Sequence, residues 1–346
     1  MLARSTKKAA IRRFPIWPSI CVAAALVLSL PASAQSPVNI RVSWVAAPNN
    51  LPPFMFKNAG IPKHLGRSYT MEAVQYRGTP QSITALAGND LDIALLSYSS
   101  FPLAIQNAGM HDLRIIADEF RDGAEGYYSS QFMVLKDGSI RKIEDLKGKV
   151  LAVNVKNGAT DGAVRSLLKK HGLREHDYNV IEVAFPNMRA VLEDHKVDLA
   201  SVGTPQFAWD PEMQKIARTL FTQRDAFGMT DVVIWVARQE FLQKNRAAMV
   251  DFMEDMLRAR AHLFDPANHA EAVDTVSKFT KIPADKLDSW LFTNRDFYRD
   301  PNARPDLAVL QKTVDELYQQ GAIKQHLDVN KYADLSILED AIKRRR

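Results

Sequence analysis

A short, nearly continuous apolar run at residues 91–96 (LDIALL) limits the fold of this chain more than any other feature. The turn-forming residues 88–90 (GND) come directly before it, so the run is interpreted as a short strand. A strand that is apolar on both faces belongs in a sheet that is covered on both sides. Because helices provide such cover, strands and helices should alternate along the chain.

Such an alternation runs from residue 38 to residue 237. Further strands are expected at 38–44, 69–76, 113–117, 131–136, 149–155, 178–185, 197–202 and 231–237, and helices at 52–64, 79–86, 160–170 and 187–194. Thr79 is expected to be the N-cap of its helix and Pro80 the first helical residue. After residue 238 the patterns are helical. The sequence therefore predicts an α/β fold in which mainly parallel sheets are flanked by helices.

The two halves of this region resemble each other faintly. Asp92 and Asp198 each lie in an apolar strand that follows a helix with proline near its start. Chance identity is one explanation, but the shared order of elements favours two similarly built lobes. The pattern breaks at 121–130 (RDGAEGYYSS) and at 223–230 (QRDAFGMT).

The first 34 residues have the pattern of a secretory signal peptide. Five basic residues precede an apolar run at 20–30, and the small residues 32–34 (ASA) predict cleavage before Gln35. An uncleaved membrane anchor is the alternative, but the apolar run is shorter than the roughly 20 residues that span a bilayer. We therefore expect a periplasmic protein without stable membrane insertion after cleavage.

Charge and cysteine content exclude several classes of function. Loss of the five basic residues of the signal peptide would leave as many basic as acidic residues, 40 of each, so the basic pI does not indicate nucleic-acid binding. The only cysteine, Cys21, lies in the signal peptide. The mature chain is therefore expected to lack disulfides, a catalytic thiolate and cysteine-ligated zinc.

Two segments resemble a known family. Residues 77–94 (RGTPQSITALAGNDLDIA) and 143–152 (IEDLKGKVLA) are similar to the nitrate/sulfonate/taurine-type solute-binding proteins of ABC importers. The resemblance covers nearly the whole mature chain. It implies the two-lobed type II periplasmic-binding fold, with a ligand cleft between the lobes. The implied division is a signal peptide at 1–34, lobe 1 at 35–126 and 230–346, and lobe 2 at 127–229.

The resemblance also implies a function. It predicts an exported receptor that closes around a small, anionic organic or inorganic solute and delivers it to the permease subunits of an ABC importer. It implies no cofactor, no metal, no catalytic residue and a monomer. Members of the family bind nitrate, bicarbonate, sulfonates, pyrimidine precursors or aromatic acids, so the identity of the ligand stays open. Its charge stays open too, because Asp161 and Asp225 lie near the loops expected to form the cleft.

Candidate ligand-binding residues follow the expected strands, because ligands of open α/β sheets bind beyond the carboxyl ends of the strands. Helix starts in the same loops offer free N–H groups to an anion. The candidates are Ser43, Trp44, Asn49, Arg77, Gly78, Thr79, Ser97, Tyr98, Ser99, Asn154, Asn157, Gly158, Ala159, Thr160, Phe185, Gly203 and Thr204.

Several candidates have plainer explanations. Thr79, Thr160 and Thr204 fit helix caps, and Trp44 fits the core as well as the cleft. The run 97–100 (SYSS) fits a solvated turn, and Arg77 fits a surface ion pair.

Two other functions compete with transport. An enzyme is one, since a similar fold occurs in a thiamine-pyrimidine synthase, but the sequence has no G-x-S-x-G, H-E-x-x-H, Walker or G-x-G-x-x-G motif. A ligand-sensing subunit of a membrane receptor is the other.

Overall fold

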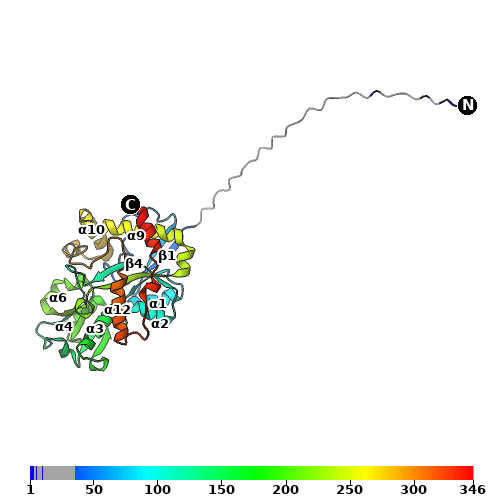
Figure 1. Ribbon diagram of the computed structural model, residues 1–346. Coiled ribbons are helices and arrows are strands. Elements are labelled where there is room, and N and C mark those ends of the chain that lie inside the picture. Colours follow the sequence, from blue (N-terminus) through cyan, green and yellow to red (C-terminus); the bar gives the residue numbers. More distant parts are fainter. Residues whose placement is uncertain (4, 6–9, 11–35, 346) are drawn as a thin grey trace. The chain divides into compact units, whose positions relative to one another are not determined.

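The computed structural model describes residues 1–3, 5, 10 and 36–345 (Figure 1). The expected signal peptide, with its apolar run and cleavage site, falls almost entirely outside these residues. The chain from Ser36 onward forms a unit of its own. Among the described helices, none is both long and apolar enough to cross a membrane.

Two five-stranded sheets organise residues 36–345. The first has the order β2-β1-β3-β10-β4 and consists of β1 (Val38–Trp44), β2 (Tyr69–Gln75), β3 (Ile93–Ser97), β4 (Leu113–Asp122) and β10 (Thr230–Arg238). The second has the order β7-β6-β8-β5-β9 and consists of β5 (Gln131–Leu135), β6 (Val150–Val153), β7 (Asn179–Glu182), β8 (Leu199–Val202) and β9 (Ala217–Thr222).

Each sheet is parallel except for one strand. β10 is antiparallel to both of its neighbours in the first sheet, and β5 is antiparallel to both of its neighbours in the second. Each reversed strand is the one that enters its sheet after the chain crosses over from the other sheet. The crossings run from Asp122 to Gln131 and from Thr222 to Thr230. We call the parts built on the first and second sheets lobe 1 and lobe 2.

In both sheets an aspartate just before a strand forms two hydrogen bonds with the backbone of the neighbouring parallel strand. Asp92 precedes β3, donates its N–H to Arg41 O, and accepts the Arg41 N–H on Oδ2 at 2.8 Å. Asp198 precedes β8, donates its N–H to Val150 O, and accepts the Val150 N–H on Oδ2 at 2.9 Å. Both aspartates therefore fix the register of a parallel strand pair, which explains the faint repeat in the sequence.

Each sheet is flanked by helices that are close to its strands in the sequence (Figure 1). α1 (Thr79–Ala87) and α2 (Ser100–Ala108) contact β3 in lobe 1, and α4 (Met188–Glu193) contacts β8 in lobe 2. Lobe 2 also contains α3 (Ala159–Lys170), α5 (Pro205–Ala208), α6 (Pro211–Ile216) and α7 (Gln223–Phe227). Short 3-10 helices lie at Ile143–Leu146, Glu175–Asp177, Phe185–Asn187, Pro266–Asn268 and Val329–Tyr332.

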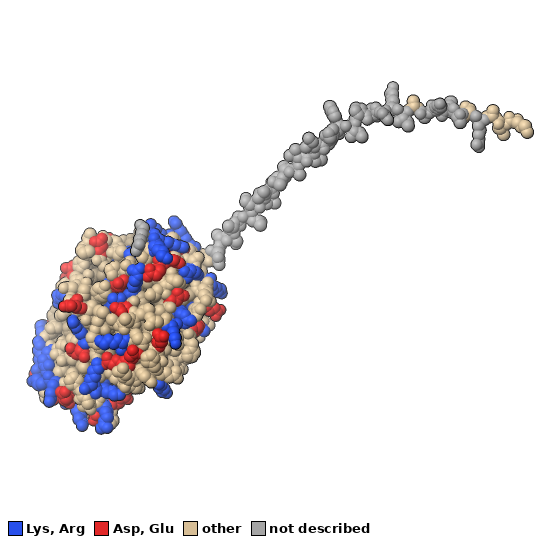
Figure 2. Space-filling model, viewed as in Figure 1, with Lys and Arg blue, Asp and Glu red and all other residues tan. Residues whose placement is uncertain are grey.

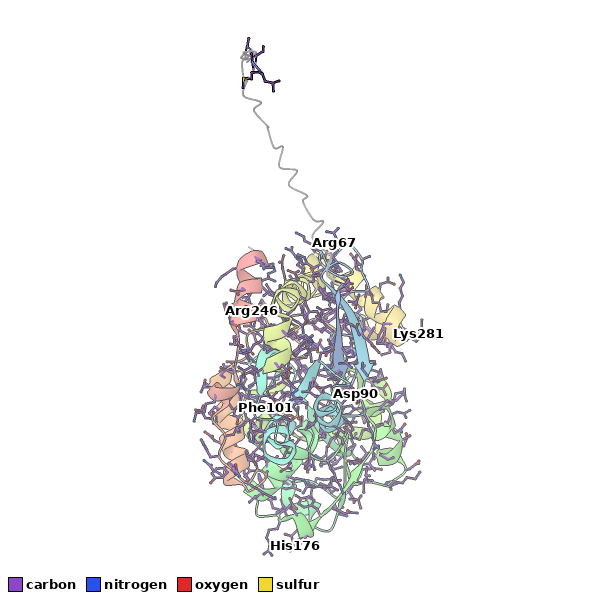
Figure 3. The ribbon with its side chains drawn as sticks, turned by 90° about the vertical axis from the view of Figure 1, so that its right-hand side faces the viewer. Arg67, Asp90, Phe101, His176, Arg246 and Lys281 are labelled. Atoms are coloured by element: carbon purple, nitrogen blue, oxygen red, sulfur yellow. The ribbon has the colours of Figure 1, made fainter. Side chains whose placement is uncertain are left out.

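The chain after β10 is helical, as the sequence predicts. It forms α8 (Gln239–Lys244), α9 (Arg246–Leu263), α10 (His269–Thr280), α11 (Ala284–Asp288), α12 (Leu307–Gln319) and α13 (Ser336–Arg345). α12 contacts β10 of lobe 1. The C-terminal part of α12 also contacts α3 of lobe 2. There Glu316 accepts from Ser166 Oγ at 3.2 Å and pairs with Lys170. Figure 3 shows Arg67 and His176 at opposite ends of the two-lobed part.

Several local features differ from the expectations, among them helix α2, which was not predicted. Residues 52–64 form turns instead of a helix, because consecutive prolines disfavour helix and the N–H groups of Lys63 and His64 bond to the distant Asp255 carboxylate. The N-cap of α1 is Gly78, one residue before the expected Thr79. Strand β9 was not predicted, because an edge strand with few buried residues has a weak apolar pattern.

We expect Asp92→Ala to lower the free energy of unfolding by about 1–3 kcal/mol, since it leaves the Arg41 N–H without its acceptor and removes an ion pair at 2.9 Å. Asp198→Ala should have a smaller effect of the same kind, and the exposed Asp90→Ala is the control. Chemical denaturation measures all three. Equal midpoints for Asp92→Ala and Asp90→Ala would contradict the register role.

Candidate functional site

A cavity opens between the strand ends of the two lobes, with about 640 Å³ of empty space, its mouth included. Its lining comes from both sheets: Val45, Ala46, Asn49, Asn50, Thr79, Leu95, Ser97, Phe120, Ser130, Asn154, Val155, Gly158, Ala159, Thr160, Phe185, Gly203, Gln223, Val232 and Val233. This is the place where ligands bind in open α/β sheets, beyond the carboxyl ends of parallel strands.

Nine of the candidates from the sequence line this cavity: Asn49, Thr79, Ser97, Asn154, Gly158, Ala159, Thr160, Phe185 and Gly203. The others lie elsewhere: Ser43, Trp44, Arg77, Gly78, Tyr98, Ser99, Asn157 and Thr204. The Ser43 hydroxyl is buried in the sheet, where it accepts the Leu95 N–H at 2.8 Å. Trp44 packs against Phe279, with ring centroids 6.0 Å apart.

Most of the remaining candidates form a seam between the lobes. Tyr98 Oη donates to Ala159 O at 2.7 Å, and Ser99 Oγ donates to Asn157 O at 3.1 Å. In the opposite direction, Asn154 Nδ2 donates to Arg77 O at 3.1 Å. In each of these bonds a side chain of one lobe meets a main-chain carbonyl of the other. The seam joins the two lobes beside the cavity, because Asn154 and Ala159 also belong to the lining.

Gly78 lies at the tightest point of the seam. A Cβ atom on Gly78 would stand 2.4 Å from Val155 Cγ1 of lobe 2. Its backbone is extended, with φ −165° and ψ 167°, so only the approach of the other lobe requires glycine here. Beside it, the half-exposed Arg77 forms an ion pair with Glu182 across the seam at 3.7 Å, as its plainer explanation predicts.

A cluster of hydroxyl groups forms one polar wall. Thr79 Oγ1 lies 3.1 Å from Ser97 Oγ, which lies 2.9 Å from both Ser99 Oγ and Ser100 Oγ. Residues 97–100 are buried, so they are not the solvated turn considered above. Thr79, Thr160 and Thr204 make no side-chain capping bond; Thr160 Oγ1 instead accepts the Asn154 N–H at 3.3 Å.

The electrostatic character of the cavity comes from backbone dipoles. None of the described residues that line it has an ionisable side chain. The N-termini of α1 and α3 both reach the lining, at Thr79 and at Gly158–Thr160, and neither has a side-chain cap. Asp161, in the first turn of α3, is occupied by the Asn157 N–H and Arg165 at 2.8 Å each. In the first turn of α1, Pro80 has no N–H and the Gln81 N–H donates to Gly78 O at 3.3 Å, which leaves the Thr79 N–H. Together with the first N–H groups of α3 and the aligned helix dipoles, it favours a negatively charged ligand group at this wall.

An aromatic stack supports the apolar wall. Phe120 is stacked on Phe297, with centroids 4.4 Å apart and planes at 23°. Phe297 in turn meets the edge of Tyr128, whose hydroxyl donates to Val202 O at 3.0 Å. Together with Leu95, Val155, Phe185, Val232 and Val233, Phe120 offers an apolar surface to the body of a ligand.

The sequence did not indicate the rest of the lining: Val45, Ala46, Asn50, Leu95, Phe120, Ser130, Val155, Gln223, Val232 and Val233. Some are immediate neighbours of candidates, and a wider window around each strand end would have included them. Gln223 follows β9, so it would have been found only if that strand had been recognised.

A buried carboxylate holds the two crossing segments together. Asp122, at the end of β4, accepts the Ser130 N–H at 2.8 Å and the Ser129 hydroxyl. Ser130 O accepts the Gln223 N–H at 2.9 Å, and Ser129 Oγ accepts the Arg224 N–H at 3.1 Å. Burial raises the pKa of Asp122 from 3.8 to about 6, although these hydrogen bonds oppose the rise.

Comparisons with known proteins identify the relatives of this chain. The sequence profile of the NMT1-like family matches residues 33–277. No curated protein matches the chain significantly. The alkanesulfonate-binding protein SsuA from Xanthomonas axonopodis pv. citri, bound to MOPS, is similar with a TM-score of 0.68 and 18% identity, over 87% of this chain and 99% of that one.

Two further solved structures have the same architecture. The periplasmic nitrate-binding protein NrtA from Synechocystis PCC 6803 has a TM-score of 0.69 and 15% identity over 89% of each chain. The desulfurization enzyme DSZB has a TM-score of 0.60 and 12% identity, over 89% of this chain and 100% of that one. At such identities the likeness shows the fold alone. The expected two-lobed type II periplasmic-binding fold is confirmed.

The raised pKa of Asp122 gives a pH prediction. The folded protein holds this proton more tightly than the unfolded chain, so the associated stability is complete below pH 3.8 and is lost as the pH rises through about 6. Over that range the loss is roughly 3 kcal/mol. Asp122→Asn should show a flatter dependence of Tm on pH between 4 and 7, as measured by calorimetry.

A second buried aspartate, Asp231, also affects the pH dependence of Tm, but it does so in both proteins. Burial also raises its pKa, to about 7 beside Arg121, and it contributes equally in the wild type and the variant. The difference between the two curves therefore reports Asp122 alone. Parallel curves would show that the pKa of Asp122 is the same in the folded and unfolded chain.

Proposed function

The chain belongs to the NMT1-like family, and on this basis we propose that it is an exported receptor that captures a small solute between its lobes for an ABC importer. The observation that carries the proposal is the cavity, which both lobes line at their strand ends and which no ionisable side chain among the described residues enters. Periplasmic location and cleavage after residue 34 are part of the proposal. The partners would be the permease subunits, with the receptor acting as a monomer.

The ligand would be a small acid with an apolar body. Its anionic group would accept hydrogen bonds from the N–H groups that begin α1 and α3. The hydroxyls of Thr79 and Thr160 would add donors at the same wall, and Phe120 and Phe185 would contact the body. Dipoles suffice for this task because a cavity shielded from water strengthens each polar interaction.

Capture would proceed by rotation of the lobes about the crossing segments. We place lobe 1 at 35–126 and 230–346 and lobe 2 at 127–229, so both boundaries fall in those segments. The seam bonds of Tyr98, Ser99 and Asn154 would break on opening, when water replaces each carbonyl partner. Contacts that the ligand makes with both lobes would then favour the closed state.

Binding is a better explanation of this cavity than catalysis, although DSZB shows that an enzyme can have this fold. The Thr79 and Ser97 hydroxyls bond to each other, and the Thr160 hydroxyl accepts a main-chain N–H. No histidine that could activate them is among the described residues of the lining. Within the described residues no group of His, Cys, Asp and Glu side chains could hold a metal ion.

The surface charge is consistent with a receptor for small solutes. In Figure 2 acidic side chains lie among the basic ones over much of the visible face. On this face the mixture of charges offers no continuous basic path for a nucleic-acid backbone. The receptor would therefore meet its importer through local contacts near the lobe tips, and we propose no nucleic-acid partner.

A thermal-unfolding panel tests the proposed function. Mature protein from Gln35 onward should gain Tm selectively with one class among inorganic anions, sulfonates, aromatic carboxylates and pyrimidines. A ligand at about 100 times its Kd stabilises the folded state by roughly 2.7 kcal/mol. A compound that is consumed during incubation would favour an enzyme instead, and a protein that responds to none of the classes would contradict the proposal.

Gly78→Ala tests lobe closure. Within lobe 1 the Cβ atom would lie 3.3 Å from Oε1 of the flexible Gln81 side chain, which can move aside. The closed seam leaves no room, because the Cβ atom would lie 2.4 Å from Val155 Cγ1. We expect an unchanged Tm without ligand, at least tenfold weaker ligand binding, and loss of ligand-dependent compaction in small-angle scattering. The control is Gly138→Ala, whose Cβ would meet its neighbours at 3.4 Å or more. Wild-type affinity in Gly78→Ala would show that binding does not require this seam.

A further inference from the structure

Gln223 is the one fully buried side-chain amide in the described lining. It is the first residue of α7 and is 0% exposed. Neither Oε1 nor Nε2 has a hydrogen-bond partner among the described residues. Burial of an amide without its hydrogen bonds is unfavourable, so such groups in proteins usually serve a ligand or an ordered water.

The backbone holds this amide in place. The Gln223 N–H donates to Ser130 O at 2.9 Å, within the crossing that Asp122 anchors. The preceding Thr222 N–H donates to Asp225 Oδ2 at 2.7 Å, which closes the first turn of α7. These bonds fix the backbone position from which the buried Gln223 side chain projects.

A second amide lines the cavity from lobe 1. Asn49 is 5% exposed, and its Oδ1 also has no partner among the described residues. Its Nδ2 donates to Gly203 O across the seam at 3.5 Å, the long limit of a hydrogen bond. Both lobes therefore present uncharged groups that offer donors and acceptors, in addition to the helix N-termini.

The hydrogen-bonding groups of the Gln223 amide indicate which ligand groups can pair with it. The Gln223 side chain offers two N–H donors and a carbonyl acceptor side by side. A ligand with an N–H next to a C=O, as in a lactam or cyclic ureide, satisfies both through a pair of hydrogen bonds. A sulfonate or nitrate oxygen could accept from Nε2, but Oε1 would then face a second acceptor. A site built for a hydrogen-bonding group rejects analogues that lack it.

We propose that Gln223 determines the specificity of the cavity, and that the ligand is a small acid with a cyclic amide edge. The acid group lies at the starts of α1 and α3, and the N–H/C=O edge pairs with Gln223. This inference rests on the proposed function, because it assigns the ligand class of the same cavity. It excludes simple sulfonates and inorganic anions as the preferred ligands.

Two matched pairs of acids test the inference by calorimetric titration. Orotate has the amide edge and benzoate, of similar size, lacks it; 2-pyrrolidone-5-carboxylate and cyclopentanecarboxylate differ in the same way. The wild type should bind the amide member of at least one pair ten times more tightly or better. Gln223→Leu should abolish that preference without weakening the carbocyclic acid, because only the paired hydrogen bonds are lost.

Two further measurements keep the test decisive. The Tm of Gln223→Leu without ligand should be higher than that of the wild type, because an unsatisfied buried amide is removed. Gln223→Glu, which retains an acceptor but carries charge, should bind every acid more weakly. Gly138→Ala again serves as the control.

The outcomes separate the inference from the proposed function. Equal affinity within both pairs, or a preference that survives in Gln223→Leu, overturns the role of Gln223. Selective binding of a sulfonate or inorganic anion overturns the amide edge but leaves the receptor function intact. A wild type that binds none of these compounds overturns both.

Discussion

The arrangement of the site depends on one buried carboxylate at the first crossing between the lobes. Asp122 ends β4 and binds Ser129 and Ser130, and these residues bind the backbone of Gln223 and Arg224 at the second crossing. Two chain segments about a hundred residues apart are thereby joined at the point where the lobes meet. The hydrogen bonds between the two crossings therefore fix the positions at which Ser130 and Gln223 line the cavity.

The lobes on either side are built by the same rules. Each has parallel strands, one reversed strand that arrives from the other lobe, and an aspartate that fixes the register beside its central strand. Their strand ends face each other, so helix N-termini from both lobes reach one space. The N-termini of helices from both lobes provide a positive potential in this space. Charged side chains are therefore not needed in the lining to attract an anion.

Local sequence determines much of this fold but less of the site. The apolar run before Ser97 and the positions of Thr79 and Thr160 follow from strand and helix patterns, which depend on near neighbours. The turns at 52–64 depend on Asp255, a residue far away in the chain, and no local pattern contains that information. The strand-end rule also located Tyr98 and Ser99, but whether a side chain enters the cavity or the seam depends on how the two lobes meet.

The four seam hydrogen bonds donated by Tyr98, Ser99, Asn154 and Asn49 are accepted by main-chain carbonyls, at Ala159, Asn157, Arg77 and Gly203. A carbonyl is present whatever side chain a residue bears, so a substitution at Arg77 or Ala159 leaves the acceptor in place, whereas a Cβ atom on Gly203 would lie 2.9 Å from Thr160 Cγ2. Apart from Asn49 and Asn154, which donate seam bonds, the side chains that line the cavity can therefore change while the lobes continue to meet in the same way. A family with this interface between its lobes can evolve to bind new ligands by changing a few cavity side chains. The segments about which the lobes rotate need not change.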